Sequence, residues 1–111
     1  MKPNSNFLLS NLIAHRGYHS EKDSIPENSL PAFIKAIENN YIIELDLHIL
    51  KDGNVVVFHD DNLNRMTGLN KNIKDTTYDE IKDLRLKNTN NFIPLFEDVL
   101  NLVNGKVPII V

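Results

Sequence analysis

Glu44 and Asp46 are two acidic residues that lie two positions apart in an otherwise apolar segment. In an extended strand, side chains at this spacing share one face, with Cα atoms ~6.6 Å apart. Two carboxylates that point into the same space repel each other unless a cation lies between them. Carboxylate oxygens are hard ligands that suit Mg²⁺ or Ca²⁺ better than zinc. The pair therefore predicts a divalent metal site, and the alternative is an acidic, solvent-facing edge strand.

Two histidines follow apolar segments that have the composition of buried strands. His15 and Arg16 follow residues 12–14, and His59 follows residues 55–58. If these strands are parallel, their carboxyl ends open on the side that also carries the acidic pair. Imidazole can take up or release a proton near neutral pH, so the cluster predicts a general acid and a general base beside a metal. The alternative is that each histidine simply ends a strand.

The elements that must position these residues alternate between strands and helices. Ser29 or Asn28 can cap a helix that has Pro31 in its first turn, and Thr77 and Glu80 have the spacing of a capping box. Apolar strands that alternate with helices predict an α/β fold with a parallel sheet. In chain order, we expect strands at residues 12–14, 41–48, 55–58 and 107–111, helices at 29–40, 78–84 and 95–104, a turn at 51–54, and irregular segments at 17–28, 60–76 and 87–92.

Length and composition narrow the class of protein. A chain of 111 residues forms one domain at most, and its 41% hydrophobic and 24% charged residues indicate a globular fold. The net charge of −3 gives no electrostatic reason to expect a nucleic acid partner. Because cysteine is absent, disulfides and thiolate chemistry are excluded. No apolar stretch approaches the ~20 residues of a membrane span, and residues 1–10 lack the apolar core of a signal peptide, so we expect a cytoplasmic protein.

Five short motifs follow one another along the chain, and together they are specific. In order, they are His15-Arg16-Gly17, Pro26-Glu27-Asn28-Ser29, Glu44-Leu45-Asp46-Leu47, Lys51-Asp52-Gly53 and His59-Asp60. Further matches are Leu63, Arg65 and Thr67, then Ile93-Pro94 with Glu97, Val99 and Leu100. In this order and spacing, the chain from about Leu12 to its end resembles the glycerophosphodiester phosphodiesterase family.

The resemblance implies the N-terminal part of a TIM (β/α)8 barrel, with its first three to four strands, their helices and an active site at the carboxyl ends of the strands. Residues 1–111 would then be the N-terminal portion of a domain that is incomplete at its C-terminus, since such a barrel needs about 250 residues. The implied roles are general acid and base for His15 and His59, phosphate binding for Arg16, binding of Ca²⁺ or Mg²⁺ for Glu44 and Asp46, and support of the site for Glu27 and Asn28.

The implied reaction is metal-dependent hydrolysis of a small glycerophosphodiester to glycerol 3-phosphate and an alcohol. The neighbouring glycerol hydroxyl attacks phosphorus, the alcohol leaves, and water then opens the cyclic phosphate. The metal would polarise the phosphoryl oxygens and lower the pKa of that hydroxyl. The planar guanidinium of Arg16 suits a bidentate contact with phosphate oxygens. Most of the residues that would recognise the head group would lie in later loops.

Three positions depart from the family pattern. A third carboxylate ligand would fall just beyond Val111, Leu95 stands where a capping hydroxyl residue is usual, and Ile49-Leu50 replaces a segment that often ends in Thr. The last strand would also leave an open sheet edge. We therefore expect the chain alone to be inactive unless it associates with a second copy or a complementary fragment through that edge.

Other functions fit part of the same pattern. The related barrel phospholipases, which include sphingomyelinase-type toxins, also use two histidines and an acidic metal site, and a panel of head groups would distinguish them. A non-catalytic module would bind a phosphodiester without turnover. An inactive fragment would have no function of its own.

Overall fold

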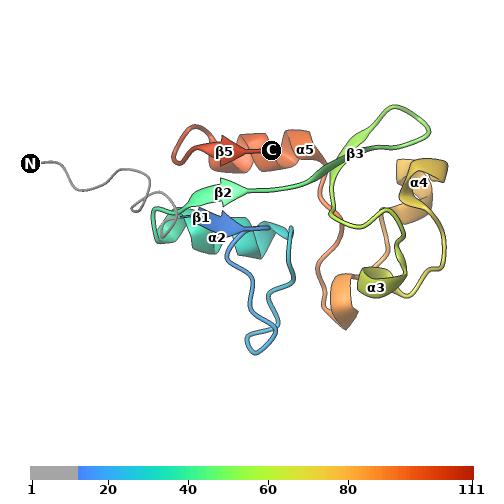
Figure 1. Cartoon of the computed structure of the whole chain (residues 1–111), viewed down its shortest axis with the longest axis horizontal. Helices are drawn as coiled ribbons and strands as arrows, with labels where there is room; N and C mark the ends of the chain where they lie inside the picture. Colours follow the sequence, from blue (N-terminus) through green and yellow to red (C-terminus); the bar gives the residue numbers. More distant parts are fainter. Residues whose placement is uncertain (1–12) are drawn as a thin grey trace, which may run out of the picture.

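Three short strands form a parallel sheet in the computed structural model, which describes residues 13–111. The strands are β1 (Ile13–His15), β2 (Ile42–Glu44) and β5 (Ile109–Ile110), in the order β1-β2-β5 (Figure 1). The register places His15 opposite Glu44, and Glu44 opposite Ile110. Leu12, which was expected in the first strand, lies outside the described residues. The expected parallel α/β sheet is confirmed for these three strands.

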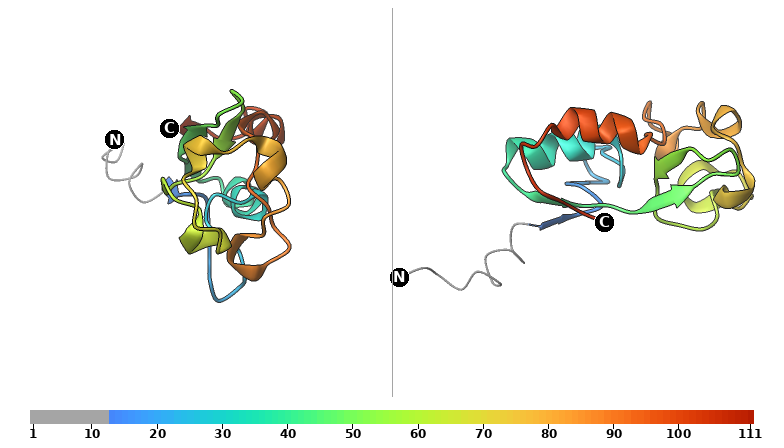
Figure 2. Two further views of the ribbon diagram at one scale, coloured as in Figure 1. Left: turned by 90° about the vertical axis from the view of Figure 1, so that its right-hand side faces the viewer. Right: turned by 90° about the horizontal axis from the view of Figure 1, so that it is seen from above.

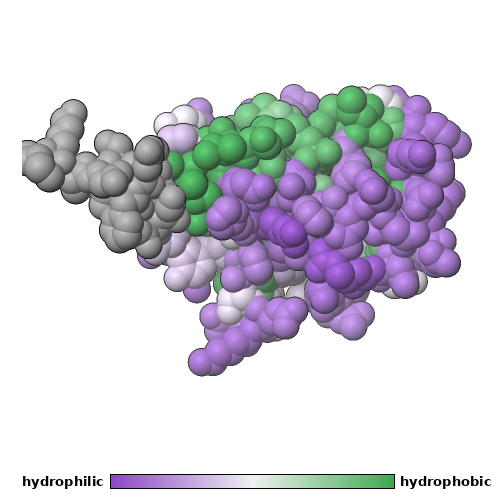
Figure 3. Space-filling view, in the orientation of Figure 1, coloured by the Kyte–Doolittle hydropathy of each residue, from purple (hydrophilic) through white to green (hydrophobic). Residues whose placement is uncertain are grey.

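Helices α2 (Leu30–Glu38) and α5 (Phe96–Val103) both lie on one face of this sheet (Figure 2). Because side chains alternate along a strand, Ala14, Ile43 and Leu45 point toward the helices and are buried. No described element covers the opposite face, where Figure 3 shows an apolar band over the strands. The core between the sheet and the helices contains Ala14, Phe33, Ala36, Ile43, Leu45, Val57, Val99, Val103 and Val107.

The two covering helices begin and end close to where the sequence predicts. The Ser29 hydroxyl accepts a hydrogen bond from the Ala32 N–H, and proline in the first turn costs no hydrogen bond. Leu95, as expected, gives α5 no side-chain cap. That helix ends at Val103, and the two residues that follow, Asn104 and Gly105, both have positive φ angles.

The strand expected at 41–48 is two strands, because the chain changes partner at Asp46. The Leu45 N–H still donates to the Ile110 carbonyl in the parallel sheet, whereas the Asp46 carbonyl accepts from the Phe58 N–H. Beyond Asp46, β3 (Leu47–Ile49) pairs antiparallel with β4 (Val55–Val57) across the expected turn at 51–54. The expectation that the 55–58 strand belongs to the parallel sheet is therefore wrong.

Strand β4 lies between two cores, which explains its unbroken apolar sequence. Val57 packs in the core between the sheet and the helices, while Val56 and Phe58 pack in a second core. A strand that is buried on both faces shows no polar alternation, in a parallel sheet or elsewhere. The second core contains Leu50, Val56, Phe58, Leu63, Met66, Ile73, Ile81, Leu86 and Ile93.

Residues 47–95 form an excursion between β2 and α5 that surrounds this second core. The capping box of Thr77 and Glu80 is present and begins α4, which ends three residues before the expected Leu84. The segments 60–76 and 87–92, which were expected to be irregular, include short helices whose single turns are too brief to show a helical period. The helices of the excursion are α3 (Asn64–Thr67), η1 (Ile73–Asp75), α4 (Tyr78–Ile81) and η2 (Leu86–Asn88). None of the helices in residues 13–111 has the length and apolar character that crossing a membrane requires.

Gly17→Ala should destabilise the fold more than the matched change Gly53→Ala. Both glycines have a positive φ, of 78° and 88° respectively. A Cβ on Gly17 would lie 2.8 Å from the Ala32 Cβ, whereas a Cβ on Gly53 would meet no atom within 4 Å. The extra overlap should lower the free energy of unfolding of Gly17→Ala by about 1–3 kcal/mol relative to Gly53→Ala, as measured by urea denaturation. Equal losses would show that the close approach at Gly17 is relieved without cost.

Candidate active site

The backbone turn after β1 places Arg16 at the carboxyl ends of the strands. Arg16 and Gly17 both have positive φ angles, of 56° and 78°, and the Gly17 N–H donates to the Ala14 carbonyl at 3.1 Å. Gly17 is needed here because the turn packs directly against α2. The Arg16 N–H donates to Glu44 Oε1 at 3.0 Å, so the turn and the end of β2 are held together.

The Arg16 guanidinium contacts side chains from three separate segments. Its Nη1 lies 3.3 Å from both carboxylate oxygens of Glu27, and its Nε lies 3.9 Å from Asp46 Oδ2. Its Nη2 lies 3.0 Å from His59 Nε2. About a third of the side chain, 34%, stays exposed. A guanidinium in this position can therefore contact an incoming phosphate while it remains next to the other polar groups of the site.

Glu44 and Asp46 both open on the face of the sheet that the helices do not cover, while Leu45 between them is buried. Asn28 donates through Nδ2 to Asp46 Oδ2 at 3.2 Å, and its backbone N–H donates to the Arg16 carbonyl at 2.7 Å. The Asn28 side chain is buried, and its Oδ1 has no hydrogen-bond partner. The side-chain oxygens of Glu44, Asp46 and Asn28 are hard donors, so these residues suit Mg²⁺ or Ca²⁺. Within residues 13–111, no three His, Asp or Glu side chains form a complete metal site.

His59 contacts a polar group through each of its ring nitrogens. Nδ1 lies 2.8 Å from Asp60 Oδ1, and Nε2 lies 3.0 Å from Arg16 Nη2. A carboxylate only accepts and a guanidinium only donates, so a neutral His59 carries its proton on Nδ1 and leaves Nε2 as an acceptor. His48, whose role the sequence left open, contacts the His59 carbonyl oxygen through Nε2 at 3.0 Å.

Arg65 bridges two carboxylates next to this histidine. Its Nε lies 2.7 Å from Asp60 Oδ2, and its Nη1 and Nη2 lie 3.0 and 2.9 Å from the two oxygens of Glu27. The hydrogen bond from Arg65 is the largest cause that lowers the pKa of Asp60, to about 2. Burial raises the pKa of Glu27, but the hydrogen bonds and charges of Arg65 and Arg16 outweigh it and hold that pKa below its ordinary value. Both carboxylates are therefore ionised at neutral pH.

The charges of the site do not balance without a further cation. Three carboxylates, those of Glu27, Asp46 and Asp60, lie against the guanidiniums of Arg16 and Arg65, and a fourth, Glu44, accepts the Arg16 backbone N–H. With neutral histidines, four negative and two positive charges leave an excess of two negative charges. A divalent cation would neutralise this excess.

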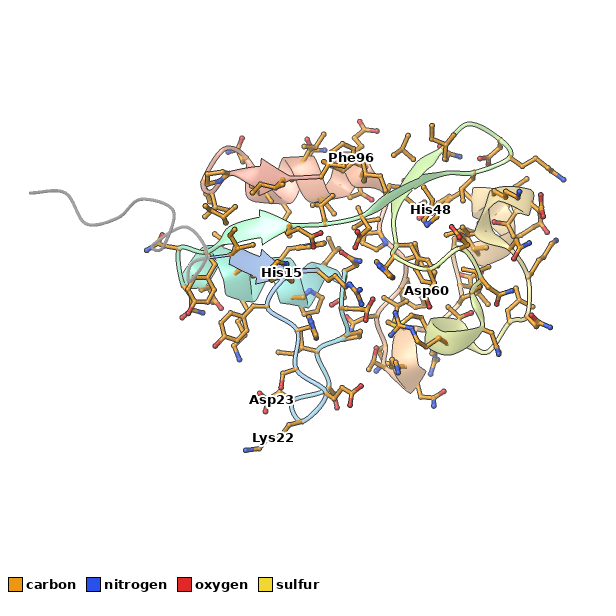
Figure 4. The ribbon with its side chains drawn as sticks, viewed as in Figure 1. His15, Lys22, Asp23, His48, Asp60 and Phe96 are labelled. Atoms are coloured by element: carbon orange, nitrogen blue, oxygen red, sulfur yellow. The ribbon has the colours of Figure 1, made fainter. Side chains whose placement is uncertain are left out.

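His15 lies at the carboxyl end of β1, and Asp60 lies on the excursion (Figure 4). The ring of His15 is exposed, and among residues 13–111 no hydrogen bond joins it to the other predicted site residues. It is adjacent to Glu44 through the strand register. The structure thus places every predicted site residue at one end of the sheet and joins all of them except His15 by direct contacts.

Asp60 and Arg65 contact the candidate site, and the sequence analysis assigns no individual role to either residue. Asp60 was visible only as the neighbour of His59, and Arg65 only as one of several matches to a family pattern. The contact between Arg65 and Glu27 joins residues 38 positions apart, and no local spacing predicts such a contact. The available sequence signal for a contact of Arg65 with the site was its positive charge, which follows the acidic Asp60 by five positions.

Several known proteins are similar to this chain in sequence and fold. Residues 15–111 match the glycerophosphoryl diester phosphodiesterase family. A glycerophosphodiester phosphodiesterase of Bacillus altitudinis is 38% identical over 107 residues, which cover 88% of this chain and 42% of that protein. The chain spans about two fifths of the length of the curated relatives it matches.

Solved structures of the same family superpose on this fold. The glycerophosphodiester phosphodiesterase from Thermotoga maritima has a TM-score of 0.72 at 40% identity, and the match covers 88% of this chain and 41% of that one. An Oleispira antarctica phosphodiesterase in complex with the product sn-glycerol-3-phosphate has a TM-score of 0.76 at 28% identity, and the match covers 87% of this chain and 41% of that one. The likeness confirms that the sheet and helices are part of a TIM barrel. From the match of its motifs, its fold and nearly its whole length, this chain belongs to the glycerophosphoryl diester phosphodiesterase family.

Proposed function

We propose that this chain supplies the N-terminal part of an enzyme that hydrolyses small glycerophosphodiesters to glycerol 3-phosphate and an alcohol. The observation that carries the proposal is the position of Arg16, which contacts His59, Glu27 and Asp46 at the carboxyl ends of the strands. A phosphate bound to this guanidinium would lie beside a proton acceptor and beside the acidic pair. The product seen in the Oleispira antarctica relative supports a substrate of this class.

The two histidines would move the protons of the reaction. The unprotonated Nε2 of His59 suits removal of the proton from the neighbouring glycerol hydroxyl, whose oxygen then bonds to phosphorus. The bond from phosphorus to the departing alcohol oxygen breaks as His15 gives that oxygen a proton. Water then opens the cyclic phosphate with the histidines in reversed roles, which yields glycerol 3-phosphate. Arg16 would hold the phosphate oxygens throughout.

Glu44 and Asp46 would hold a divalent cation, Ca²⁺ or Mg²⁺, and Asn28 would keep Asp46 in place. A cation bound there would supply positive charge that polarises the phosphoryl oxygens. Two carboxylates alone form an incomplete set of ligands, so we propose that a third comes from a later part of the barrel. The excess of two negative charges at the site supports a divalent ion.

We also propose that the open sheet is completed by further barrel strands, which would come from a complementary fragment or a second copy. The uncovered face carries apolar side chains beside the site residues, and Ile110 and Val111 are 45% and 71% exposed. Among the described residues, β1 and β5 are the two edge strands of the parallel sheet, and their outer backbone N–H and C=O groups are available for pairing with further strands. Residues 1–111 would thus be one portion of a larger domain, and we expect the chain alone to be inactive.

A completed protein should release glycerol 3-phosphate from glycerophosphocholine. The completed protein is this chain joined to the part of the Bacillus altitudinis relative that follows its match to this chain. His15→Ala and His59→Ala should each lower kcat by about 10²–10⁴-fold. His19→Ala is the matched control, because His19 is exposed on the neighbouring loop. Binding of glycerol 3-phosphate without turnover would instead favour a non-catalytic module, and turnover of sphingomyelin or lysolipids alone would favour a barrel phospholipase.

Chelation should abolish turnover by the completed protein, and added Ca²⁺ or Mg²⁺ should restore it. Glu44→Gln and Asp46→Asn should each raise the metal concentration needed for half-maximal activity, because each removes a charged oxygen ligand. Glu97→Gln, on the first turn of α5, is a control that keeps the site intact. Full activity in chelator would contradict the metal-dependent reaction.

We also expect complementation in trans. The chain alone and the C-terminal part of the relative alone should both be inactive, and mixing them should restore turnover if the open sheet edges pair. The mixture should also elute earlier than either part on size-exclusion chromatography. Turnover by the chain alone, together with elution as a dimer, would show that a second copy completes the site. Failure of the parts to associate would contradict pairing through the open sheet.

A further inference from the structure

We propose that Arg65 is a positioning residue that fixes Asp60, so that His59 keeps its proton on Nδ1 and presents Nε2 to the substrate. This inference rests on the proposed function, in which His59 transfers a proton. Arg65 lies on α3 in the excursion and contacts no reacting group directly. Its effect would pass through Asp60 to the imidazole.

The contacts of Arg65 leave little freedom to Asp60. The guanidinium reaches Asp60 Oδ2 through Nε at 2.7 Å and Oδ1 through Nη2 at 3.1 Å. Two contacts from a planar group fix both the distance and the rotation of a carboxylate. Asp60 Oδ1 is therefore held at the place where it accepts the His59 Nδ1–H at 2.8 Å. A lysine could offer a positive charge here but not the same planar geometry.

A second pair of contacts fixes Arg65 itself. Its Nη1 and Nη2 lie 3.0 and 2.9 Å from the oxygens of Glu27, whose side chain is 10% exposed. Glu27 also contacts Arg16 at 3.3 Å. The two arginines and two carboxylates thus form a chain of contacts that starts at the phosphate-binding group and ends at His59. Arg65 joins the excursion, which carries His59, to the loop beside the sheet.

The same arrangement determines the tautomer of His59. A histidine in water exchanges its proton between the two ring nitrogens, and a hydrogen bond to one of them selects a tautomer. Here Asp60 accepts from Nδ1, and the Arg16 guanidinium approaches Nε2 as a donor. When a phosphate engages Arg16, Nε2 would be released for proton transfer, and only the contact between Asp60 and Nδ1 would still hold the ring. Loss of Arg65 should then let both the ring and its tautomer vary.

The test compares Arg65→Gln with Arg85→Gln. Arg85 lies in the same excursion, is exposed, and makes no ion pair within residues 13–111, so it controls for loss of one positive charge. Nitrogen-15 NMR of the imidazole rings is recorded on this chain at about pH 8.5, where imidazoles with an ordinary pKa near 6.5 are neutral. His59→Gln identifies the His59 signals among those of the four histidines.

The expected result is specific to one variant. In the wild type and in the control variant Arg85→Gln, His59 should show a protonated Nδ1 and an unprotonated Nε2. In Arg65→Gln, the two nitrogen shifts should move toward each other, as expected for exchange between tautomers. Unchanged shifts in a folded Arg65→Gln chain would overturn the proposal. If that variant does not fold, Arg65→Lys takes its place; a partial change supports the proposal and an unchanged spectrum overturns it.

Kinetics on the completed protein separate a positioning role from a merely structural one. Arg65→Gln should lower kcat roughly 10- to 100-fold, as is common for residues that orient a functional imidazole, while KM changes by a smaller factor. Arg65→Lys should recover part of the lost kcat, and Arg85→Gln should match the wild type. A change in KM alone would contradict the proposal. If the wild-type completed protein is inactive, the proposed function fails, whereas the NMR comparison still decides whether Arg65 fixes His59.

Discussion

The site depends on the need to neutralise carboxylates that face one another. Glu27 and Asp46 lie against Arg16, Glu27 and Asp60 lie against Arg65, and Glu44 accepts the Arg16 backbone N–H. Carboxylates that share a site repel one another when they are ionised. Each guanidinium offsets this repulsion because it offers several hydrogen-bond donors in a fixed plane. In the resulting arrangement, Arg16 lies between the acidic pair and His59. The remaining negative charge is what a bound divalent cation would neutralise.

The path of the backbone explains how distant segments meet at this point. Strand β3 leaves the sheet at Asp46, and β4 returns antiparallel to it, so the end of β4 comes back to the place from which the chain departed. The hydrogen bond from the Phe58 N–H to the Asp46 carbonyl marks that return. His59 therefore reaches the carboxyl end of the parallel sheet without belonging to it. The hairpin thus brings a candidate site residue to this end of the sheet, while its Leu50, Val56 and Phe58 pack in the second core.

The sequence predicted those features that depend on local spacing. The cap at Ser29, the capping box at Thr77 and the shared face of Glu44 and Asp46 follow from periods of a few residues, and the structure contains them. The antiparallel hairpin could not be predicted in this way, because the alternation of apolar and polar residues continues unchanged through Asp46, where the chain changes partner. Contacts of Arg65 with residues of two different segments left no periodic signal. The local pattern thus predicted the candidate site, whereas the contacts between its side chains are visible only in the tertiary structure.

We propose above all that Glu44 and Asp46, beside Arg16, form a site for a divalent cation. Paramagnetic Mn²⁺, which binds hard oxygen ligands as Mg²⁺ does, tests this claim directly on the 111-residue chain. At low Mn²⁺ concentrations, amide signals of residues 15–17 and 44–46 should broaden before all others, and excess Mg²⁺ or Ca²⁺ should reverse the effect. Broadening that begins elsewhere, for example at the exposed acidic residues of α4, or that spreads evenly over the chain, would contradict the claim.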